Sequence, residues 1–210
     1  MRRERAAEPR CNTVGKSSPE EAPLTDPERI RRARQGDPAA WEDLVRLHQE
    51  AAFRLAYLIL GDAAEAEDAA QEAFLSAFRS LGRFDETRPF RPWLMRIAAN
   101  QARNRRRSLG RRWARLQRMA RQDPDTVQGT RPPRGAPEEA ESLWLAVRHL
   151  GAEDQEVIYL RYFLGLSEAE AADVMQVPVG TAKSRLHRGL GRLREIVIRD
   201  YPWLREALSE

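Results

Sequence analysis

The sequence predicts an all-α protein built from two small helical domains joined by a flexible linker. Apolar residues recur at spacings of three and four along much of the chain, which is the period of a helix with one buried face. Residues that favour helix starts and ends, such as an aspartate before a proline or a glycine after an apolar run, flank these stretches. No stretch shows the two-residue alternation of a β-strand.

The composition narrows the classes of function. The 210 residues suffice for one medium domain or two small ones, and 36 Lys and Arg against 32 Asp and Glu give a net charge of +4. Lys16 and Lys183 are the only lysines, so almost every cation is an arginine, which binds phosphate through two parallel hydrogen bonds. This composition is compatible with nucleic-acid binding without requiring it.

Cysteine usage and apolar run lengths exclude other classes. Cys11 is the sole cysteine, which rules out a disulfide framework within the chain and a cysteine-rich zinc site. The longest apolar run, residues 55–60, is far too short to span a bilayer, and the first residues lack the apolar segment of a secretory signal. We therefore expect a cytoplasmic protein with no membrane span, metal or other cofactor.

A disordered tail is expected to precede the first domain. Residues 1–25 contain almost no large apolar side chains, so burial cannot offset the entropy lost on ordering. The first domain is predicted over residues 26–110. Aspartates at N-cap positions and glycines at helix ends divide it: Asp26 before Pro27, Gly36, Asp37 before Pro38, Gly61, Asp62 with Glu65, and Gly82.

The helix predicted from Asp62 to Gly82 has an acidic face. Its exposed side carries Asp68, Gln71 and Glu72. Carboxylates four residues apart could hold a divalent cation, but no histidine lies at helical spacing to complete such a site. A solvated surface is the simpler interpretation, and a docking face for a basic partner is the third.

A loop and a basic helix follow. The loop, residues 83–89, bears Phe84, and the helix is predicted over residues 90–107 with Trp93 facing the core. Arginine and asparagine side chains share another face of this helix: Arg96, Asn100, Arg103, Asn104 and Arg107. Phosphate-binding arginines beside hydrogen-bonding amides and an aromatic loop are typical of surfaces for single-stranded or melted DNA.

The segment 111–137 is predicted to be a linker rich in Arg, Pro and Gly. Four prolines and two glycines fall between residues 122 and 137, which disfavours a continuous element. Residues 138–208 then form the second predicted domain. It contains a helix to Leu150, another from Glu153 to about Phe163, and a final pair of helices within residues 166–194.

The final pair has the pattern of a helix-turn-helix. Ser167 and Glu170 have the spacing of a capping box, and Pro178 ends the first helix because the residue before a proline avoids the α region. The second helix begins near Val179, and small or apolar residues form its buried stripe: Ala182, Leu186, Leu190 (or Gly189), Leu193 and Val197. Its other face is basic and polar: Lys183, Ser184, Arg185, His187, Arg188 and Arg192. Such a face suits the DNA major groove, whereas the simpler interpretation is a solvated amphipathic helix.

Three motifs in this order carry a family resemblance. They are DAAQEAFLSAFRSLGRF (68–84), FRPWLMRIAANQARN (90–104) and LSEAEAADVMQVPVGTAKSRLHR (166–188). Together they resemble an extracytoplasmic-function (ECF) sigma factor of the sigma-70 family. The resemblance implies a region 2-like helical bundle over residues 26–110 and a region 4-like helix-turn-helix over residues 138–208.

The resemblance also implies a role for each matching residue. Core RNA polymerase, through a coiled coil of its β′ subunit, would bind the face with Asp68, Gln71, Glu72 and Phe78. The promoter −10 element would contact the loop and the following helix: Phe84, Asp85, Thr87, Arg88, Arg96, Asn100, Arg103 and Asn104. The −35 element would contact Lys183, Ser184, Arg185, His187 and Arg188. The implied partners are the β and β′ subunits of core polymerase, promoter DNA and an anti-sigma factor.

The resemblance favours an alternative sigma factor, which recognises promoters and opens DNA without catalysing a reaction itself. A stand-alone helix-turn-helix repressor or activator is the alternative, but it leaves the helix around Asn100 without a role. An enzyme would need clustered catalytic groups. His48, His149 and His187 lie in separate segments, and no glycine-rich phosphate loop occurs.

Overall fold

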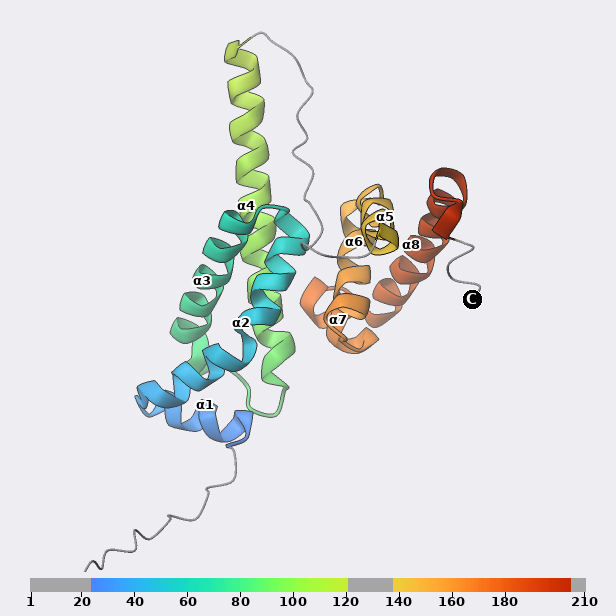
Figure 1. Cartoon of the computed structure of the whole chain (residues 1–210). Helices are drawn as coiled ribbons and strands as arrows, with labels where there is room; N and C mark the ends of the chain where they lie inside the picture. Colours follow the sequence, from blue (N-terminus) through green and yellow to red (C-terminus); the bar gives the residue numbers. More distant parts are fainter. Residues whose placement is uncertain (1–23, 121–137, 205–210) are drawn as a thin grey trace, which may run out of the picture.

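The computed structural model describes residues 24–120 and 138–204, and within them the regular structure is entirely helical (Figure 1). The helices α1–α4 form an N-terminal unit, and α5–α8 form a C-terminal unit. This arrangement confirms the all-α class and the two helical domains. The tail expected over residues 1–25 lies outside the described residues, apart from Leu24 and Thr25, and so does the stretch 121–137 of the expected linker.

The first helix, α1 (Asp26–Arg34), begins one residue earlier than expected. Thr25 is its N-cap, and the backbone N and Oγ1 of Thr25 donate to Glu28 Oε2 at 2.8 and 2.9 Å. The prediction of Asp26 as N-cap is therefore wrong. Asp26 is instead the first helical residue, where a carboxylate interacts favourably with the helix dipole.

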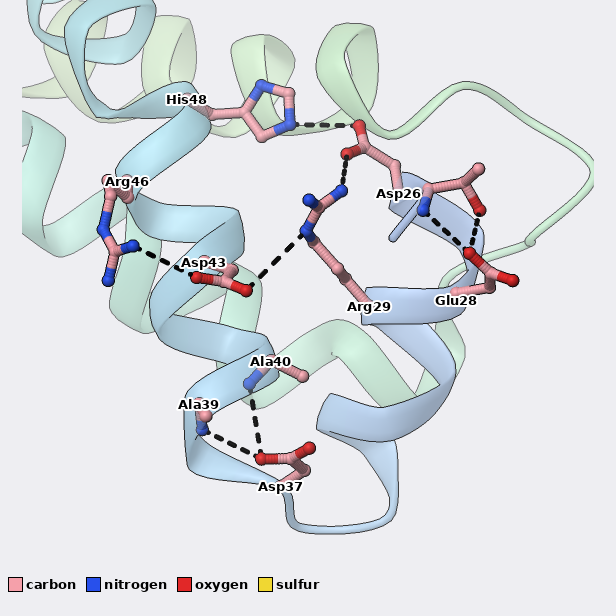
Figure 2. A network of polar contacts seen from close by, with 10 residues as sticks. Asp26, Glu28, Arg29, Asp37, Ala39, Ala40, Asp43, Arg46 and His48 are labelled. Carbon is pink, nitrogen blue, oxygen red and sulfur yellow. Dashed lines mark hydrogen bonds and ion pairs between the residues drawn. The ribbon is translucent and has the colours of Figure 1, made fainter. Parts of the chain in front are cut away.

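The second helix, α2 (Pro38–Leu60), starts and ends as predicted. Asp37 Oδ1 accepts from the backbone N–H groups of Ala39 and Ala40 at 3.0 and 3.4 Å (Figure 2). Gly61 ends the helix in the left-handed conformation with φ 82°, which glycine adopts without the Cβ penalty.

Alanines line the contact between α3 (Ala63–Ser80) and α4 (Phe90–Ala120). Among the residues of these helices whose burial the structure describes, the buried alanines are Ala66, Ala69, Ala70, Ala73, Ala77, Ala98, Ala99 and Ala102. Side chains this small allow helix axes to approach closely. A 3₁₀ turn, η1 (Leu81–Arg83), follows α3. Because α4 extends to Ala120, the first ten residues of the expected linker are helical.

The C-terminal unit consists of α5 (Glu138–Arg148), α6 (Ala152–Ile158), the π-helical turn η2 (Tyr159–Phe163), α7 (Glu168–Met175) and α8 (Val179–Asp200). The capping box that starts α7 is confirmed, with Ser167 N–H donating to Glu170 Oε2 at 2.8 Å and Glu170 N–H to Ser167 Oγ at 3.2 Å. Gln176 then reverses the chain in the left-handed conformation, φ 57°. The helices α7 and α8 form the predicted helix-turn-helix.

The two units are in direct contact. α4 packs against α7 (Figure 1). α2 packs against η2. Buried apolar side chains of both units belong to one connected cluster. No helix in the described part of the chain is long and apolar enough to cross a membrane.

Candidate functional site

The helix α8 presents a basic and polar surface away from its own unit. Ala182, Leu186 and Gly189 are buried, so the predicted stripe holds this helix on the rest of the C-terminal unit. The predicted contact residues on its other side are exposed: Lys183, Ser184, His187 and Arg188. Among the residues that the structure describes, neither Lys183 nor Arg188 has an acidic partner. Their charges are therefore available to an external anion.

Arg185 differs from the rest of this face. Its side chain is only 20 % exposed, and its Nη2 lies 3.0 Å from Glu153 Oε2 on α6. This residue therefore shares its charge with a carboxylate of its own unit.

Asp154, which was not predicted as a site residue, and Gly189, a candidate for the buried stripe, position α8. Asp154, on α6, is buried and accepts from Arg192 Nη1 at 2.6 Å. A Cβ on Gly189 would lie 3.2 Å from the Cβ of Asp154, which is tighter than ordinary packing. The missing side chain at Gly189 therefore lets α8 approach α6 closely.

The helix α4 brings the predicted arginines and asparagines together. Arg103 Nη2 donates to Asn100 Oδ1 at 2.6 Å, and Arg107 Nη2 donates to Asn104 Oδ1 at 2.7 Å. These contacts hold the guanidinium groups along one face of the helix.

Arg103 also reaches across to the C-terminal unit. Its Nη1 lies 2.9 Å from Oε1 of Glu156, which is buried on α6. Burial raises the pKa of Glu156, and the positive charge of Arg103 acts in the opposite direction. The arginine thus serves as counter-ion to a carboxylate that is largely removed from water.

The loop before α4 is shaped by its own hydrogen bonds. Asp85 Oδ1 accepts from the backbone N–H of Thr87 at 3.0 Å and from Thr87 Oγ1 at 2.7 Å. These bonds lower the pKa of Asp85. Arg34 of α1 supports the loop, since its Nε donates to the Leu81 carbonyl at 2.9 Å and its guanidinium also contacts Glu86. No local pattern indicates this role of Arg34, because its partners lie about fifty residues away.

Phe84 does not lie on the surface of this loop. Its side chain is buried, and its ring centroid lies 4.7 Å from that of Trp93 and 5.7 Å from that of Phe90. The side chain therefore anchors the loop in the core. It is not positioned in this structure to stack on a base.

The two remaining predicted arginines of this region meet one carboxylate. Arg88 Nη2 lies 2.6 Å from Asp173 Oδ1, and Arg96 Nη1 lies 3.6 Å from the same atom. Asp173 belongs to α7 of the C-terminal unit. Both arginines are thus paired across the contact between the units.

The predicted docking face combines acidic and apolar groups. Phe78 and Leu75 on α3 are 53 % and 51 % exposed, and the Phe78 ring lies 5.1 Å from that of Trp41 on α2. Beside them, α2 and α3 enclose a groove of about 510 Å³. Exposed apolar patches of this kind mark interaction surfaces.

The acidic members of this face have partners within the chain. Asp68 pairs with Arg105 of α4, which also pairs with Glu65. Glu72 lies 3.8 Å from Arg79, and Gln71 donates to Glu67 at 3.5 Å. In the described ranges, no group of three His, Cys, Asp or Glu side chains is arranged to hold a metal ion.

Comparison with known proteins identifies the family. The sequence model of Sigma-70 region 2 matches residues 44–112, and that of Sigma-70, region 4 matches residues 140–193. The ECF RNA polymerase sigma factor SigW of Bacillus subtilis is 33% identical over 175 residues, which cover 80% of this chain and 94% of SigW. The chain is an ECF RNA polymerase sigma factor of the sigma-70 family. The RNA polymerase sigma-H factor of Pseudomonas aeruginosa is a further relative of this sigma factor, 35% identical over 87% of the chain and 97% of the relative.

Solved structures agree with this assignment of the fold. CnrH, determined in complex with the cytosolic domain of CnrY, matches this sigma factor with a TM-score of 0.63 and 28% identity, covering 83% of this chain and 98% of CnrH. The sigma factor RpoE of Bartonella quintana, in complex with the anti-sigma factor NepR, matches with a TM-score of 0.62 and 24% identity, covering 76% and 97%. The chain matches both sigma-70 regions and its relatives are RNA polymerase sigma factors, so the stand-alone helix-turn-helix interpretation is not favoured.

Proposed function

We propose that this sigma factor recruits core RNA polymerase, recognises promoter −10 and −35 elements, and opens DNA without catalysing a reaction itself. The observation that carries the proposal is the exposed basic and polar face of α8 on a helix-turn-helix. The family provides the context, because the relatives are RNA polymerase sigma factors. Since RNA polymerase is its partner, the chain would act in the cytoplasm.

The −35 contact is assigned to α8. Lys183, Ser184, His187 and Arg188 would approach base edges and phosphates in the major groove, which admits one α-helix. Arg185 would contribute once DNA competes with Glu153 for its guanidinium. Arg192 pairs with the buried Asp154, so we assign it to holding α8 in place.

The −10 contact is assigned to α4 and the loop before it. Arg88, Arg96 and Arg103 would bind phosphates, and Asn100 and Asn104 would hydrogen-bond unpaired bases. Asp85 and Thr87 would hold the loop in the shape that receives a flipped base. Flipping a base costs a few kcal/mol, so a preformed loop and a basic track are needed to offset it.

Polymerase docking is assigned to the exposed face of α3. Phe78 and the neighbouring apolar groove would supply buried area, and Asp68, Gln71 and Glu72 would supply polar contacts to a coiled coil of the β′ subunit. Since Asp68 already pairs with Arg105, Phe78 and Glu72 are the sharper targets for mutation. The β subunit completes the proposed core partner.

Residues 26–110 and 138–208 are proposed as the two functional domains, with residues 111–137 as the connection. An anti-sigma factor is a further proposed partner. CnrH, which resembles this chain in fold, was solved with the cytosolic domain of CnrY bound. By analogy, we expect a second protein to bind this sigma factor and hold it inactive.

The test is reconstitution with purified core polymerase. We expect the chain to copurify with core polymerase and to direct run-off transcription from a subset of a promoter library. Transcripts that appear without this chain, or a chain that binds duplex DNA but never polymerase, would favour the stand-alone DNA-binding protein.

A second arm tests the assignment of the −10 surface. Asn100→Ala with Asn104→Ala, both on α4 and both assigned to unpaired bases, should leave −35 duplex binding intact and abolish promoter opening. Permanganate footprinting of unpaired thymines measures this opening directly. Normal opening would remove these residues and their face of α4 from the proposal.

A further inference from the structure

Residues proposed to hold −10 DNA form ion pairs across the contact between the two units. Arg88 and Arg96 pair with Asp173 at 2.6 and 3.6 Å, and Arg103 pairs with Glu156 at 2.9 Å. Both carboxylates belong to the C-terminal unit. A carboxylate and a DNA phosphate offer arginine the same kind of anionic oxygen acceptor. Asp173 and Glu156 therefore stand where phosphates would have to bind.

A neutral contact and a cleft extend this junction. Arg91 Nη2 donates to the Leu164 carbonyl at 2.7 Å, which ties the start of α4 to the C-terminal unit. At the other end, residues of both proposed DNA surfaces line one cleft of about 430 Å³, among them Arg103, Arg107 and Arg185. That volume matches a small molecule, and a DNA duplex cannot enter it.

The arrangement also conflicts with the spacing of a promoter. The −10 and −35 elements lie on the order of 25 base pairs apart, roughly 85 Å at about 3.4 Å per base pair. Two units in direct contact cannot reach both elements at once. Residues 121–137 connect the units, and a chain of that length can span at most about 60 Å. The covalent connection therefore permits the units to separate.

We infer that the free sigma factor is closed on itself, with Asp173 and Glu156 occupying the arginines that bind −10 DNA, and that promoter engagement requires the C-terminal unit to leave α4. This inference rests on the proposed DNA-binding role of those arginines. The closure needs no second protein. The apparent DNA affinity equals the affinity of the open chain multiplied by the fraction of chains that are open, so closure weakens binding.

The first experiment measures the closure without DNA. Spin labels are attached to two introduced cysteines at exposed positions, Ala64→Cys on α3 and Ala169→Cys on α7. The native cysteine is removed by Cys11→Ser so that it takes no label. Double electron–electron resonance between the two labels should give one short, narrow distance distribution in the free full-length chain. In Asp173→Asn the distribution should gain a longer and broader component, because the open fraction rises about two- to fivefold. It should become long and broad as a whole when the chain is bound to core polymerase on a promoter. A long, broad distribution in the unsubstituted free chain would overturn the inference and leave the proposed function untouched.

The second experiment measures the competition with DNA. The probe is a labelled pool of random-sequence single-stranded DNA oligonucleotides, read by fluorescence anisotropy. Asp173→Asn should bind it about two- to fivefold more tightly than the unsubstituted chain, the range expected from losing partly exposed ion pairs. The matched control is Glu195→Gln, which removes one charge from an exposed position of the same unit and should change the affinity less.

A charge exchange separates the ion pair from a general effect of charge or folding. Arg88→Asp combined with Asp173→Arg should restore the short distance distribution while failing to restore DNA binding. An exchanged chain that stays open, with circular dichroism of a folded protein, would overturn the inference. If Asp173→Asn opens the chain but binds DNA no better than Glu195→Gln, the competition is refuted, and Arg88 and Arg96 lose their proposed role as DNA contacts.

Discussion

Both proposed DNA-binding surfaces contain arginines. The partner of each arginine determines whether its substitution affects only DNA binding or also the stability of the fold. Arg188 is exposed without an acidic partner among the described residues, whereas Arg185 pairs with Glu153 and Arg103 with the buried Glu156. Removing one partner of a buried pair leaves an uncompensated charge. Substituting Arg103 therefore disturbs the fold as well as the contact, and Arg188 gives the cleaner test.

Arg188→Ala is expected to weaken binding at a cognate −35 site by about 1–3 kcal/mol, the usual cost of losing a base contact. Arg199→Ala, near the end of the same helix and paired with its neighbour Asp200, should change binding by less than about 0.5 kcal/mol. Equilibrium titration of a promoter fragment with the reconstituted holoenzyme measures both. Equal losses would mean that only the summed charge of α8 matters.

His48 gives a prediction for stability against pH. Its ring is buried on α2, with Nε2 3.1 Å from Asp26 Oδ2 (Figure 2), and Arg29 and Arg91 lie nearby. Burial lowers the pKa of His48, and the attraction of Asp26 only partly opposes this shift. The unfolded chain therefore binds this proton at higher pH than the folded chain does. Its stabilising contribution is fully present above about pH 6.5 and is lost as the pH falls through the lower, folded-state pKa.

His48→Gln is expected to flatten this dependence, since glutamine can still hydrogen-bond Asp26 but does not titrate. Urea denaturation at about pH 7.5 and about pH 5.5, on either side of the ordinary histidine pKa, would give the free energy of unfolding of both chains. The difference between the two pH values should be smaller in the variant. An unchanged difference would assign the effect to other groups.

At the scale of elements, local chemistry predicted the helices well. The capping box of Ser167, the cap of Asp37 and the stop at Gly61 all depend on residues within a turn of one another, so the sequence contains the whole interaction. The start of α1 was misassigned because Thr25 and Asp26 are both good capping residues. The choice between them depends on Glu28 and on His48, which lies 22 residues away.

Two glycines of α8 give a matched test of helix packing. A Cβ at Gly191 would meet nothing within 4 Å, whereas a Cβ at Gly189 would meet Asp154 at 3.2 Å and Ile158 at 3.5 Å. Gly191→Ala should stabilise the chain by about 0.5–1 kcal/mol through the higher helix propensity of alanine. Gly189→Ala should gain less than Gly191→Ala or lose stability. Thermal or urea unfolding decides, and equal gains would show that α6 moves aside freely.

At the scale of the whole molecule, the two domains are predictable from the sequence, whereas the contact between them is not. The ion pair between Arg88 and Asp173 joins residues 85 positions apart, and no local pattern indicates which arginine a distant carboxylate will meet. The burial of Phe84 was missed for the same reason, since it depends on how α4 packs beside the loop. Composition alone did not decide whether the acidic and basic faces are solvated surfaces or binding surfaces. The family resemblance assigned a role to each of these faces.

Polymerase recruitment is a property of the whole molecule, and one face of α3 tests it. Phe78→Ala combined with Glu72→Arg should abolish copurification with core polymerase, because it removes an exposed aromatic group and reverses a charge on the proposed docking face. Glu195→Arg, a charge reversal at an exposed position of the C-terminal unit, serves as the control. Retained copurification of the double variant would place the docking surface elsewhere.

The length of α4 has a consequence for how the second domain is aimed. With 31 residues it forms a rod of about 45 Å that extends well beyond α2 and α3 (Figure 1). The chain therefore leaves the N-terminal unit at the far end of this helix. Each residue added to the helix turns the exit direction by about 100° about the helix axis. One alanine inserted after Arg112 turns the exit point by about 100°, and four inserted alanines nearly restore the angular phase. Because residues 121–137 then span up to about 60 Å, the two insertions should give equal transcription from promoters with graded −10 to −35 spacing. A selective loss with one alanine would show that the exit direction orients the C-terminal unit.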